Sequence, residues 1–188
     1  VGEGLVRVFH RAGANLIISA RRAAELERVK AACTDGPGTV LVLPFDLVDE
    51  QARQAAAEEV LGRYERLDVL INNAGIGQRS LIMDTRPEVD RRVMEVDFFA
   101  PVALTRLMLP RMMAQRGGHV VVTSSVAGKH GIPFHSAYCA AKHALHGYFE
   151  TLRIEMLDYD IKVCLLVIAG IRSNVFDHAL TGDGSEYG

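Results

Sequence analysis

The sequence predicts an α/β domain built on a doubly wound parallel sheet. Five short bursts, each nearly continuous in Val, Leu or Ile, alternate along the chain with amphipathic segments. A short continuous apolar run is typical of a strand buried on both faces, and alternation of strand and helix indicates a parallel sheet flanked by helices. The length of 188 residues suits a single domain over residues 1–188. In such sheets ligands bind beyond the carboxyl ends of the strands, so functional residues are sought there.

The elements follow from these two patterns in chain order. The apolar bursts predict strands over residues 15–20, 40–45, 69–72, 119–123 and 162–168. Apolar residues that recur every three or four positions predict helices over residues 3–12, 22–33, 49–64, 87–115 and 137–158.

The apolar positions also predict which face of each long helix is buried. In the helix 87–115 that face carries Val93, Val96, Ala100, Ala103 and Leu107. In the helix 137–158 it carries Ala141, Leu145, Tyr148, Leu152 and Met156.

The chain opens on a helix that no strand precedes. A doubly wound sheet ordinarily begins with a strand and a glycine-rich turn, and Val1-Gly2-Glu3-Gly4 is typical of the tail of such a turn. The end, residues 181–188, is polar and glycine-rich, without a closing strand or helix. We therefore expect a fragment that lacks the first strand and is truncated at both ends.

Composition excludes several classes of function. A net charge of −2 and the lack of a basic stripe exclude a nucleic-acid binder. The longest apolar stretch, near residues 163–171, is about half of the ~20 residues that a membrane helix needs. Three widely spaced cysteines predict no disulfide framework and favour a reducing compartment. His143 and His146 share a helix face, but no third ligand is evident, so no metal site is predicted.

The strongest chemical signal is a tyrosine and a lysine four residues apart. Tyr138 and Lys142 fall on one face of a predicted helix, one turn apart. A nearby ammonium stabilises a phenolate, and a tyrosine in this setting can exchange a proton with an alcohol or carbonyl oxygen. Taken alone, this spacing is more often a surface pair.

Two further groups follow predicted strands. Ser124-Ser125 comes directly after the strand 119–123, so Ser125 can reach the same substrate oxygen as Tyr138. Asn72-Asn73-Ala74-Gly75 ends the strand 69–72, where amides can bond across neighbouring strands and glycine lets a ligand approach. By themselves the serines are more simply a turn cap, and the asparagines and glycine a tight turn.

Together these motifs resemble the short-chain dehydrogenase/reductase family, whose fold is Rossmann-like. Asn72-Asn73-Ala74-Gly75, Ser125 and the pair Tyr138 and Lys142 stand in the family's order on the expected elements. The segments 132–138 and 179–188 are similar, more narrowly, to its dehydrogenase/reductase member 7 branch in the 7B form.

The resemblance implies a role for each matching residue. Tyr138 is the general acid/base, Lys142 supports it and holds the nicotinamide ribose, Ser125 orients the substrate oxygen, and Asp97 occupies the fourth catalytic position. The implied cofactor-binding residues are Gly2, Arg21, Arg22, Asp46, Leu47, Asn72, Ala74, Gly75, Tyr138, Lys142, Gly170, Ile171 and Ser173.

Two arginines favour NADP(H) as the cofactor. The strand 15–20 is followed by Arg21 and Arg22, where an NAD-binding protein would carry an acid for the ribose hydroxyls. The planar guanidinium suits a 2′-phosphate. The alternative is that both arginines simply solvate the start of a helix.

Three departures from the family pattern favour an alternative. The phosphate-binding turn is absent except for Gly2, Asp97 replaces the usual asparagine, and Ala169-Gly170 replaces Pro-Gly. Despite these departures, the motifs together predict an NADP-dependent oxidoreductase acting on a carbonyl or secondary alcohol. The alternative is a non-catalytic remnant that keeps the fold as a binding or dimerisation module.

The resemblance also implies partners and a location. The branch suggests a small-molecule substrate with a lipid or steroid body, and a homodimer formed through the helices 87–115 and 137–158. An N-terminal anchor, where one precedes this segment, implies association with the endoplasmic-reticulum membrane. The residues themselves leave the location open.

Overall fold

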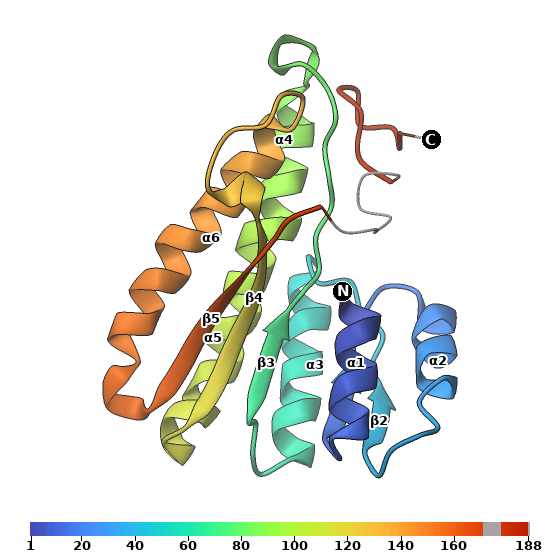
Figure 1. Cartoon of the computed structure of the whole chain (residues 1–188), viewed down its shortest axis with the longest axis vertical. Coiled ribbons are helices and arrows are strands. Elements are labelled where there is room, and N and C mark those ends of the chain that lie inside the picture. The colour runs from blue at the N-terminus through green and yellow to red at the C-terminus, as the bar shows by residue number, and fades with distance from the viewer. Residues whose placement is uncertain (171–177, 188) are drawn as a thin grey trace. The chain divides into compact units, whose positions relative to one another are not determined.

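The computed structural model describes residues 1–170 and 178–187 of the chain (Figure 1). The strands are β1 (Asn15–Ile18), β2 (Thr39–Val42), β3 (Val69–Asn72), β4 (Gly118–Ser125) and β5 (Ile161–Ile168). The helices are α1 (Gly2–Arg11), α2 (Ala23–Ala31), α3 (Glu50–Arg63), α4 (Pro87–Met94), α5 (Ala100–Gln115) and α6 (Ser136–Glu155). The predicted order and type of these elements are confirmed, with ends displaced by a few residues.

The contacts within the chain divide it into two compact units. The N-terminal unit covers Val1–Glu59, and the C-terminal unit covers Val60–Gly188. The described strands β1 to β5 pair in parallel, as predicted, and form two sheets, β1-β2 and β3-β4-β5.

The N-terminal unit consists of two strands with a helix packed against each. β1 pairs with β2 in a register that runs from Asn15 opposite Thr39 to Ile18 opposite Val42. α1 lies against β1, and α2 lies against β2. Leu26 of α2 is buried.

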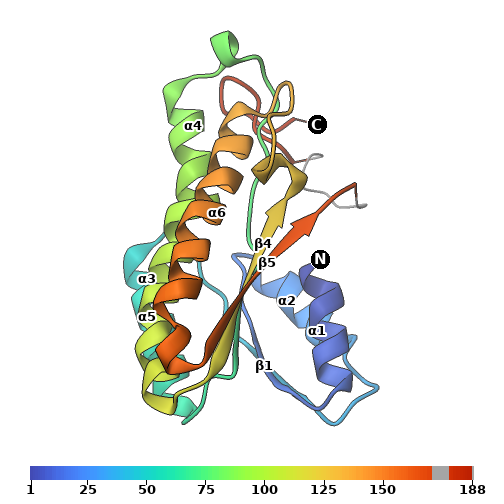
Figure 2. The ribbon, with the colours of Figure 1, turned by 60° about the vertical axis from the view of Figure 1, so that its left-hand side comes forward.

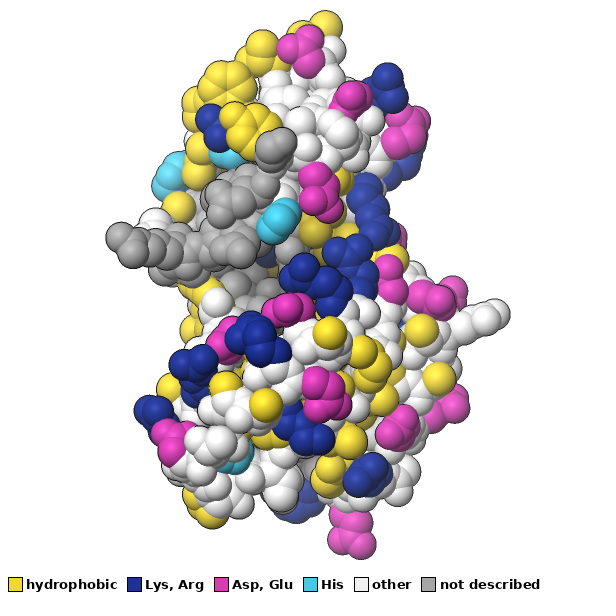
Figure 3. Space-filling model, turned by 90° about the vertical axis from the view of Figure 1, so that its right-hand side faces the viewer, with side chains coloured by type: hydrophobic (Ala, Val, Ile, Leu, Met, Phe, Trp, Pro, Cys, Tyr) yellow, Lys and Arg dark blue, Asp and Glu magenta, His cyan; other side chains and the backbone are white. Residues whose placement is uncertain are grey.

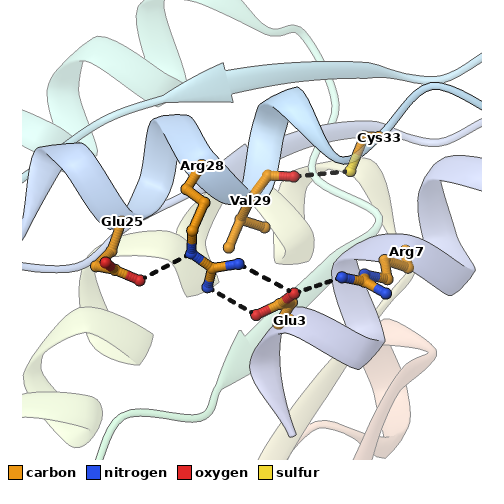
Figure 4. A network of polar contacts seen from close by, with 6 residues as sticks. All are labelled: Glu3, Arg7, Glu25, Arg28, Val29 and Cys33. Atoms are coloured by element: carbon orange, nitrogen blue, oxygen red, sulfur yellow. Dashed lines mark hydrogen bonds and ion pairs between the residues drawn. The ribbon is translucent and has the colours of Figure 1, made fainter.

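Exposed ion pairs join the two helices of this unit (Figure 4). Arg28 of α2 lies 2.9 Å from Glu3 of α1 and 3.0 Å from Glu25. Arg7 approaches the same Glu3 carboxylate to 2.6 Å. The hydrogen bond from Arg28 is the main cause that lowers the pKa of Glu3 from its ordinary value of 4.5.

The C-terminal unit is organised around β4, the central strand of its sheet. β3 pairs with one edge of β4 and β5 with the other, ending at Ser125 opposite Ile168. Figures 1 and 2 show α5 and α6 together over one face of this sheet. Side chains from these helices and from β4 form the core, including Met112, Leu145 and Phe149, all at most 1% exposed.

The predicted helix 87–115 contains a wider turn that the sequence did not reveal. Residues Glu95–Phe99 form a π-helical segment (η2) between α4 and α5. Its extra residue per turn rotates the buried face, so Asp97 and Thr105 are buried whereas Val96 and Leu107 are only partly buried. Of the predicted face, Val93 and Ala100 are buried, whereas Val96, Ala103 and Leu107 are only partly buried.

The end of the described chain pairs with the loop after β3. Leu180 forms a parallel bridge with Gln78 and an antiparallel bridge with Glu186. The nitrogen of Arg79 donates to the Leu180 carbonyl at 2.8 Å, and the Leu180 nitrogen donates to Gly77 at 2.9 Å. Across residues 1–170 and 178–187, no helix combines the length and apolar character needed to cross a membrane.

Candidate active site

α6 presents the predicted tyrosine and lysine on a buried face. Tyr138 is 8% exposed and Lys142 4% exposed, and the Lys142 Nζ lies 5.3 Å from the centroid of the Tyr138 ring. The i, i+4 spacing brings the two side chains together because they are one helical turn apart. They belong to the interior of the unit, which excludes the alternative of a surface pair.

Lys142 is held by two oxygens from other elements. Its Nζ lies 3.0 Å from Oδ2 of Asp97, which is in the π-helical segment, and donates to the carbonyl of Thr123 in β4 at 3.3 Å. The ammonium is therefore fixed between the sheet and the helical run α4–α5. A fixed ammonium beside a phenol stabilises the phenolate and so favours proton exchange by the tyrosine.

The Asp97 carboxylate is among the most buried charged groups described. Its side chain is 0% exposed, and Oδ1 accepts a hydrogen bond from the Ile76 nitrogen at 2.7 Å. Burial raises the pKa of Asp97, and the Lys142 charge and the Ile76 hydrogen bond oppose that rise. Asp97, predicted at the fourth catalytic position, thus faces Lys142 with its side-chain carboxylate.

Gly75 is required by this arrangement. A Cβ at Gly75 would lie 2.9 Å from Oδ2 of Asp97, inside van der Waals contact. The glycine of the Asn72-Asn73-Ala74-Gly75 motif therefore makes room for the Asp97 carboxylate. Ala74, beside it, is exposed beyond the end of β3.

Ser125 ends β4 and caps the turn that follows. Its Oγ accepts a hydrogen bond from the Ala127 nitrogen at 3.2 Å at the start of the short helix η3 (Val126–Gly128). Ser125 therefore does cap a turn, which is the simpler interpretation of its position in the sequence. A serine hydroxyl that accepts one bond keeps its proton for donation, so capping does not exclude orienting a substrate oxygen.

The two asparagines after β3 bond to different neighbours. Asn72 is buried, and its Nδ2 donates to Oγ1 of Thr105 in α5 at 2.9 Å. Thr105 in turn donates to the Pro101 carbonyl at 2.8 Å. The Asn73 Oδ1 accepts from Thr123 Oγ1 at 3.3 Å, across to β4. The amides therefore fasten β3 to a helix and to the next strand.

The predicted cofactor residues of the N-terminal unit follow the ends of its strands. Arg21 and Arg22 are exposed after β1, and Arg22 is the N-cap of α2. After β2, the Asp46 Oδ1 accepts from the Val48 nitrogen at 3.2 Å, and the Leu47 carbonyl accepts from the buried Arg53 at 2.7 Å.

Two more predicted cofactor positions are glycines, one in each unit. Gly2 is the first residue of α1. Gly170 follows β5, is exposed, and has φ of +37°, which suits glycine. The predicted residues Ile171 and Ser173 lie outside the described residues.

The structure thus brings the four predicted catalytic residues into one unit and divides the cofactor residues between two. Tyr138, Lys142, Asp97 and Ser125 all belong to the C-terminal unit. The residues of the C-terminal unit fit a nucleotide cofactor in part: Lys142 supplies a fixed cation, whereas the Asn72 amide nitrogen already donates to Thr105. In the N-terminal unit the exposed guanidinium groups of Arg21 and Arg22 fit an anionic phosphate.

Sequence reasoning missed Gln78, which fixes the start of the catalytic helix. Gln78 is 0% exposed. Its Oε1 accepts from the Ala137 nitrogen at 3.3 Å, and its Nε2 donates to the Ser80 Oγ at 2.8 Å. Its carbonyl is 2.6 Å from the His135 ring. Gln78 belongs to no apolar periodicity and to no motif, so no signal in the sequence singled it out.

An apolar hollow lies beside the start of α6. Its volume is about 380 Å³, and it is lined by Ile82, Gly131, Ile132, Pro133, Phe134, Ser136 and Cys139. Exposed apolar side chains continue from it at Leu81, Ile82, Met83 and Phe134. Figure 3 shows hydrophobic side chains gathered at the top of the view.

Among the described residues, no three His, Cys, Asp or Glu side chains are grouped to hold a metal ion.

Fold and site together define a class of protein. Residues 1–182 match the family described as short chain dehydrogenase, and the chain belongs to that family. The predicted resemblance, and with it the Rossmann-like α/β fold, is confirmed.

The chain is similar to curated relatives of the member 7 branch. It is 46% identical over 194 residues to "Dehydrogenase/reductase SDR family member 7B" of Bos taurus, covering 100% of this chain and 60% of the relative. It is 38% identical over 188 residues to the member 7 protein of Homo sapiens, covering 97% and 56%. The chain therefore spans about three fifths of the length of these relatives.

A solved structure shares the fold closely. A metagenomic short-chain oxidoreductase in complex with NADP superimposes with a TM-score of 0.85 at 29% identity. The match covers 90% of this chain and 77% of that chain.

Proposed function

We propose that the protein is an NADP(H)-dependent oxidoreductase that transfers a hydride between the nicotinamide and a carbonyl or secondary alcohol. The observation that carries the proposal is the buried group on α6. Lys142 lies 5.3 Å from the Tyr138 ring centroid and is fixed by Asp97 and Thr123. Membership of the short chain dehydrogenase family supports the class of reaction.

In this proposal the cofactor supplies or accepts the hydride. Tyr138 donates its hydroxyl proton to the oxygen of a carbonyl as that oxygen gains negative charge, and it takes the proton back in the reverse direction. Ser125 donates a hydrogen bond to the same oxygen and so orients it. Lys142 stabilises the phenolate that Tyr138 leaves behind. Asp97 keeps Lys142 in place through the 3.0 Å ion pair.

The test replaces the proposed proton donor. Tyr138→Phe in the longest available form of the protein is expected to lower kcat by about 100-fold or more, because the general acid is lost. Binding of NADPH, followed by fluorescence titration, is expected to remain. Tyr148→Phe on the same helix is the matched control, and it is expected to leave kcat unchanged.

Turnover retained by Tyr138→Phe would refute the assignment. Cofactor binding without turnover in the unmodified protein, for every carbonyl tested, would instead favour the non-catalytic alternative. The two outcomes are distinct because only the second concerns the protein before mutation.

The choice of NADP(H) rests on Arg21 and Arg22, which are exposed after β1. A related short-chain oxidoreductase was solved in complex with NADP, which supports the choice. Changing both arginines to alanine is expected to raise the Kd for NADPH by about 10-fold or more, because charge-assisted hydrogen bonds to the 2′-phosphate are lost. The Kd for NADH should change little, and Arg66→Ala, also exposed, is the control. Equal affinity for the two cofactors in the unmodified protein would contradict the proposal.

We also propose an apolar substrate body, of lipid or steroid kind, because the hollow of about 380 Å³ beside α6 is lined mainly by apolar side chains. Turnover that rises with the hydrophobic size of a ketone series would support this.

The partner proposed is a second copy of the chain, through the helices 87–115 and 137–158. Apolar side chains are exposed on these helices: Phe99 is 51% exposed and Ile154 is 69% exposed. Light scattering after gel filtration tests the dimer.

A further inference from the structure

A second polar chain runs along α6, one turn beyond Lys142. Ser124 Oγ and Nε2 of His146 are hydrogen-bonded at 3.0 Å. The other ring nitrogen, Nδ1, lies 3.2 Å from the Oε1 of Glu150. Tyr138, Lys142 and His146 stand at i, i+4 and i+8, so they share one stripe of the helix. The proposed mechanism uses neither Ser124 nor His146.

The chain of contacts leads from the interior to the surface. Ser124 is 2% exposed and His146 7% exposed, whereas the Glu150 side chain is 50% exposed. Lys129, just after η3, lies 3.9 Å from the same Glu150 oxygen. A buried serine and a buried histidine that satisfy each other add specificity to the packing between strand and helix.

Ser124 is placed to hold its neighbours and not to react. Serine, histidine and a carboxylate in this order also make up the nucleophilic triad of hydrolases. Here, however, the hydroxyl is almost fully buried, and a Cβ on Gly128 would lie 2.9 Å from its Oγ. Because no room remains for an acyl group at this oxygen, a nucleophilic role is excluded.

The contacts hold the segment that carries the proposed substrate-orienting serine. Ser124 immediately precedes Ser125 at the end of β4. The turn after Ser125 is attached at its start by the bond from the Ala127 nitrogen, and at its end by Lys129 and Glu150. The His146 ring also packs against Gly128, because a Cβ there would lie 3.0 Å from the ring carbon Cδ2. His146 therefore links the end of β4 to the helix that bears Tyr138.

We propose that His146 is a positioning residue: through its bond to Ser124 it sets the place of Ser125 relative to Tyr138. This inference rests on the proposed function. A misplacement of about 1 Å between reacting groups can cost about 100-fold in rate, so a positioning contact of this kind is visible in kcat.

The experiment compares two replacements of His146. His146→Phe keeps the ring volume and removes the bond to Ser124, and it is expected to lower kcat by about 10- to 100-fold. The KM for NADPH should stay within about twofold, because the bond holds the serine and not the cofactor. His146→Gln can still reach the Ser124 hydroxyl with its amide, and kcat should return to within about threefold. The kcat of each variant is measured with isatin as the carbonyl substrate.

Ser124→Ala completes the test from the other side of the bond. It should lower kcat as much as His146→Phe does, and the double variant should be no worse than either single one, because both remove the same contact. His143→Phe is the matched control, since His143 is exposed on the same helix and its ring lies 2.8 Å from the Cys139 carbonyl of that helix. It is expected to leave kcat unchanged.

A second readout separates this inference from the proposed function. The amide signal of Ser125 in a two-dimensional NMR spectrum should move in His146→Phe and return in His146→Gln, whether or not isatin is turned over. A protein without turnover but with this pattern sinks the oxidoreductase proposal and keeps the positioning contact. An unmoved Ser125 signal, a kcat loss that His146→Gln does not restore, or additive losses in the double variant would overturn the inference. Should His146→Phe fail to fold, Ser124→Ala alone decides.

Discussion

Two ion pairs in this protein join the same kinds of group at nearly the same distance. In the N-terminal unit Glu3 and Arg28 are 2.9 Å apart, and in the C-terminal unit Asp97 and Lys142 are 3.0 Å apart. The first pair is exposed, with side chains 36% and 54% accessible, and the second is buried, at 0% and 4%. The pKa of Glu3 is lowered, whereas that of Asp97 is raised. Burial, and not the presence of a partner, therefore decides which form of the carboxyl is favoured.

The difference also separates two uses of charge. An exposed pair costs little to make and little to lose, because water replaces the partner. A buried pair leaves an uncompensated charge in the interior when one member is removed. The Glu3 pair links α1 to α2, while the Asp97 pair fixes the ammonium beside Tyr138. We therefore expect the site to be sensitive at Asp97 and the N-terminal unit to tolerate changes at Glu3.

The largest expected effect is on folding stability. Asp97→Ala should lower the free energy of unfolding by about 3–5 kcal/mol, because Lys142 is left buried without its carboxylate. Glu3→Ala should cause a much smaller loss. Urea unfolding followed by circular dichroism measures both. Equal losses for the two variants would show that burial does not separate the pairs.

The second prediction concerns pH and has opposite signs at the two carboxyls. The raised pKa of Asp97 means that the folded state holds its proton more tightly, so this group's stabilising contribution is lost as pH rises above 3.8. The lowered pKa of Glu3 gives a contribution that is present above 4.5 and lost as pH falls. Relative to the unmodified protein, Asp97→Asn should therefore gain stability as pH rises, and Glu3→Gln should gain it as pH falls.

Thermal unfolding of the three proteins across that pH range checks these signs. Parallel profiles for Asp97→Asn and the unmodified protein would mean that Asp97 titrates alike in the folded and unfolded states. That result would remove the pKa contrast from the comparison while leaving the geometry unchanged.

The smallest expected effect is on the response to salt. The screening length falls from about 10 Å at 0.1 M to about 3 Å at 1 M ionic strength, and exposed pairs are weakened most. The stability difference between Glu3→Gln and the unmodified protein should shrink as sodium chloride is added. The difference for Asp97→Asn should stay nearly constant, because solvent ions do not reach a pair that is 0% and 4% exposed. A buried pair that responds to salt as strongly as Glu3 would break the contrast.

Much of the fold was predictable from local pattern. Hydrophobic bursts located the five strands of the described residues, and periodicity located the helices, because both depend on neighbours within a few residues. The π-helical segment at Glu95–Phe99 was not predictable, since nothing in its composition marks the wider turn. That one segment rotated the buried face of α5 and brought Asp97 inside.

The site was predictable in part, for the same reason. The spacing of Tyr138 and Lys142 predicted their shared face, because an i, i+4 relation is a property of the helix alone. The side-chain partners were not predictable. Asn72 bonds to Thr105 inside the unit, and Gln78 holds the start of α6 without belonging to any pattern.

The sequence by itself determined the order of the elements, the parallel α/β class, the family and the residues placed at the strand ends. These depend on periodicity and on short motifs, which are local. Tertiary structure alone decided that Asp97 faces Lys142 with its carboxylate and that Ser124 bonds to His146. Both contacts join side chains from different elements in a buried environment, and their energies depend on burial and distance, which no spacing along the chain encodes.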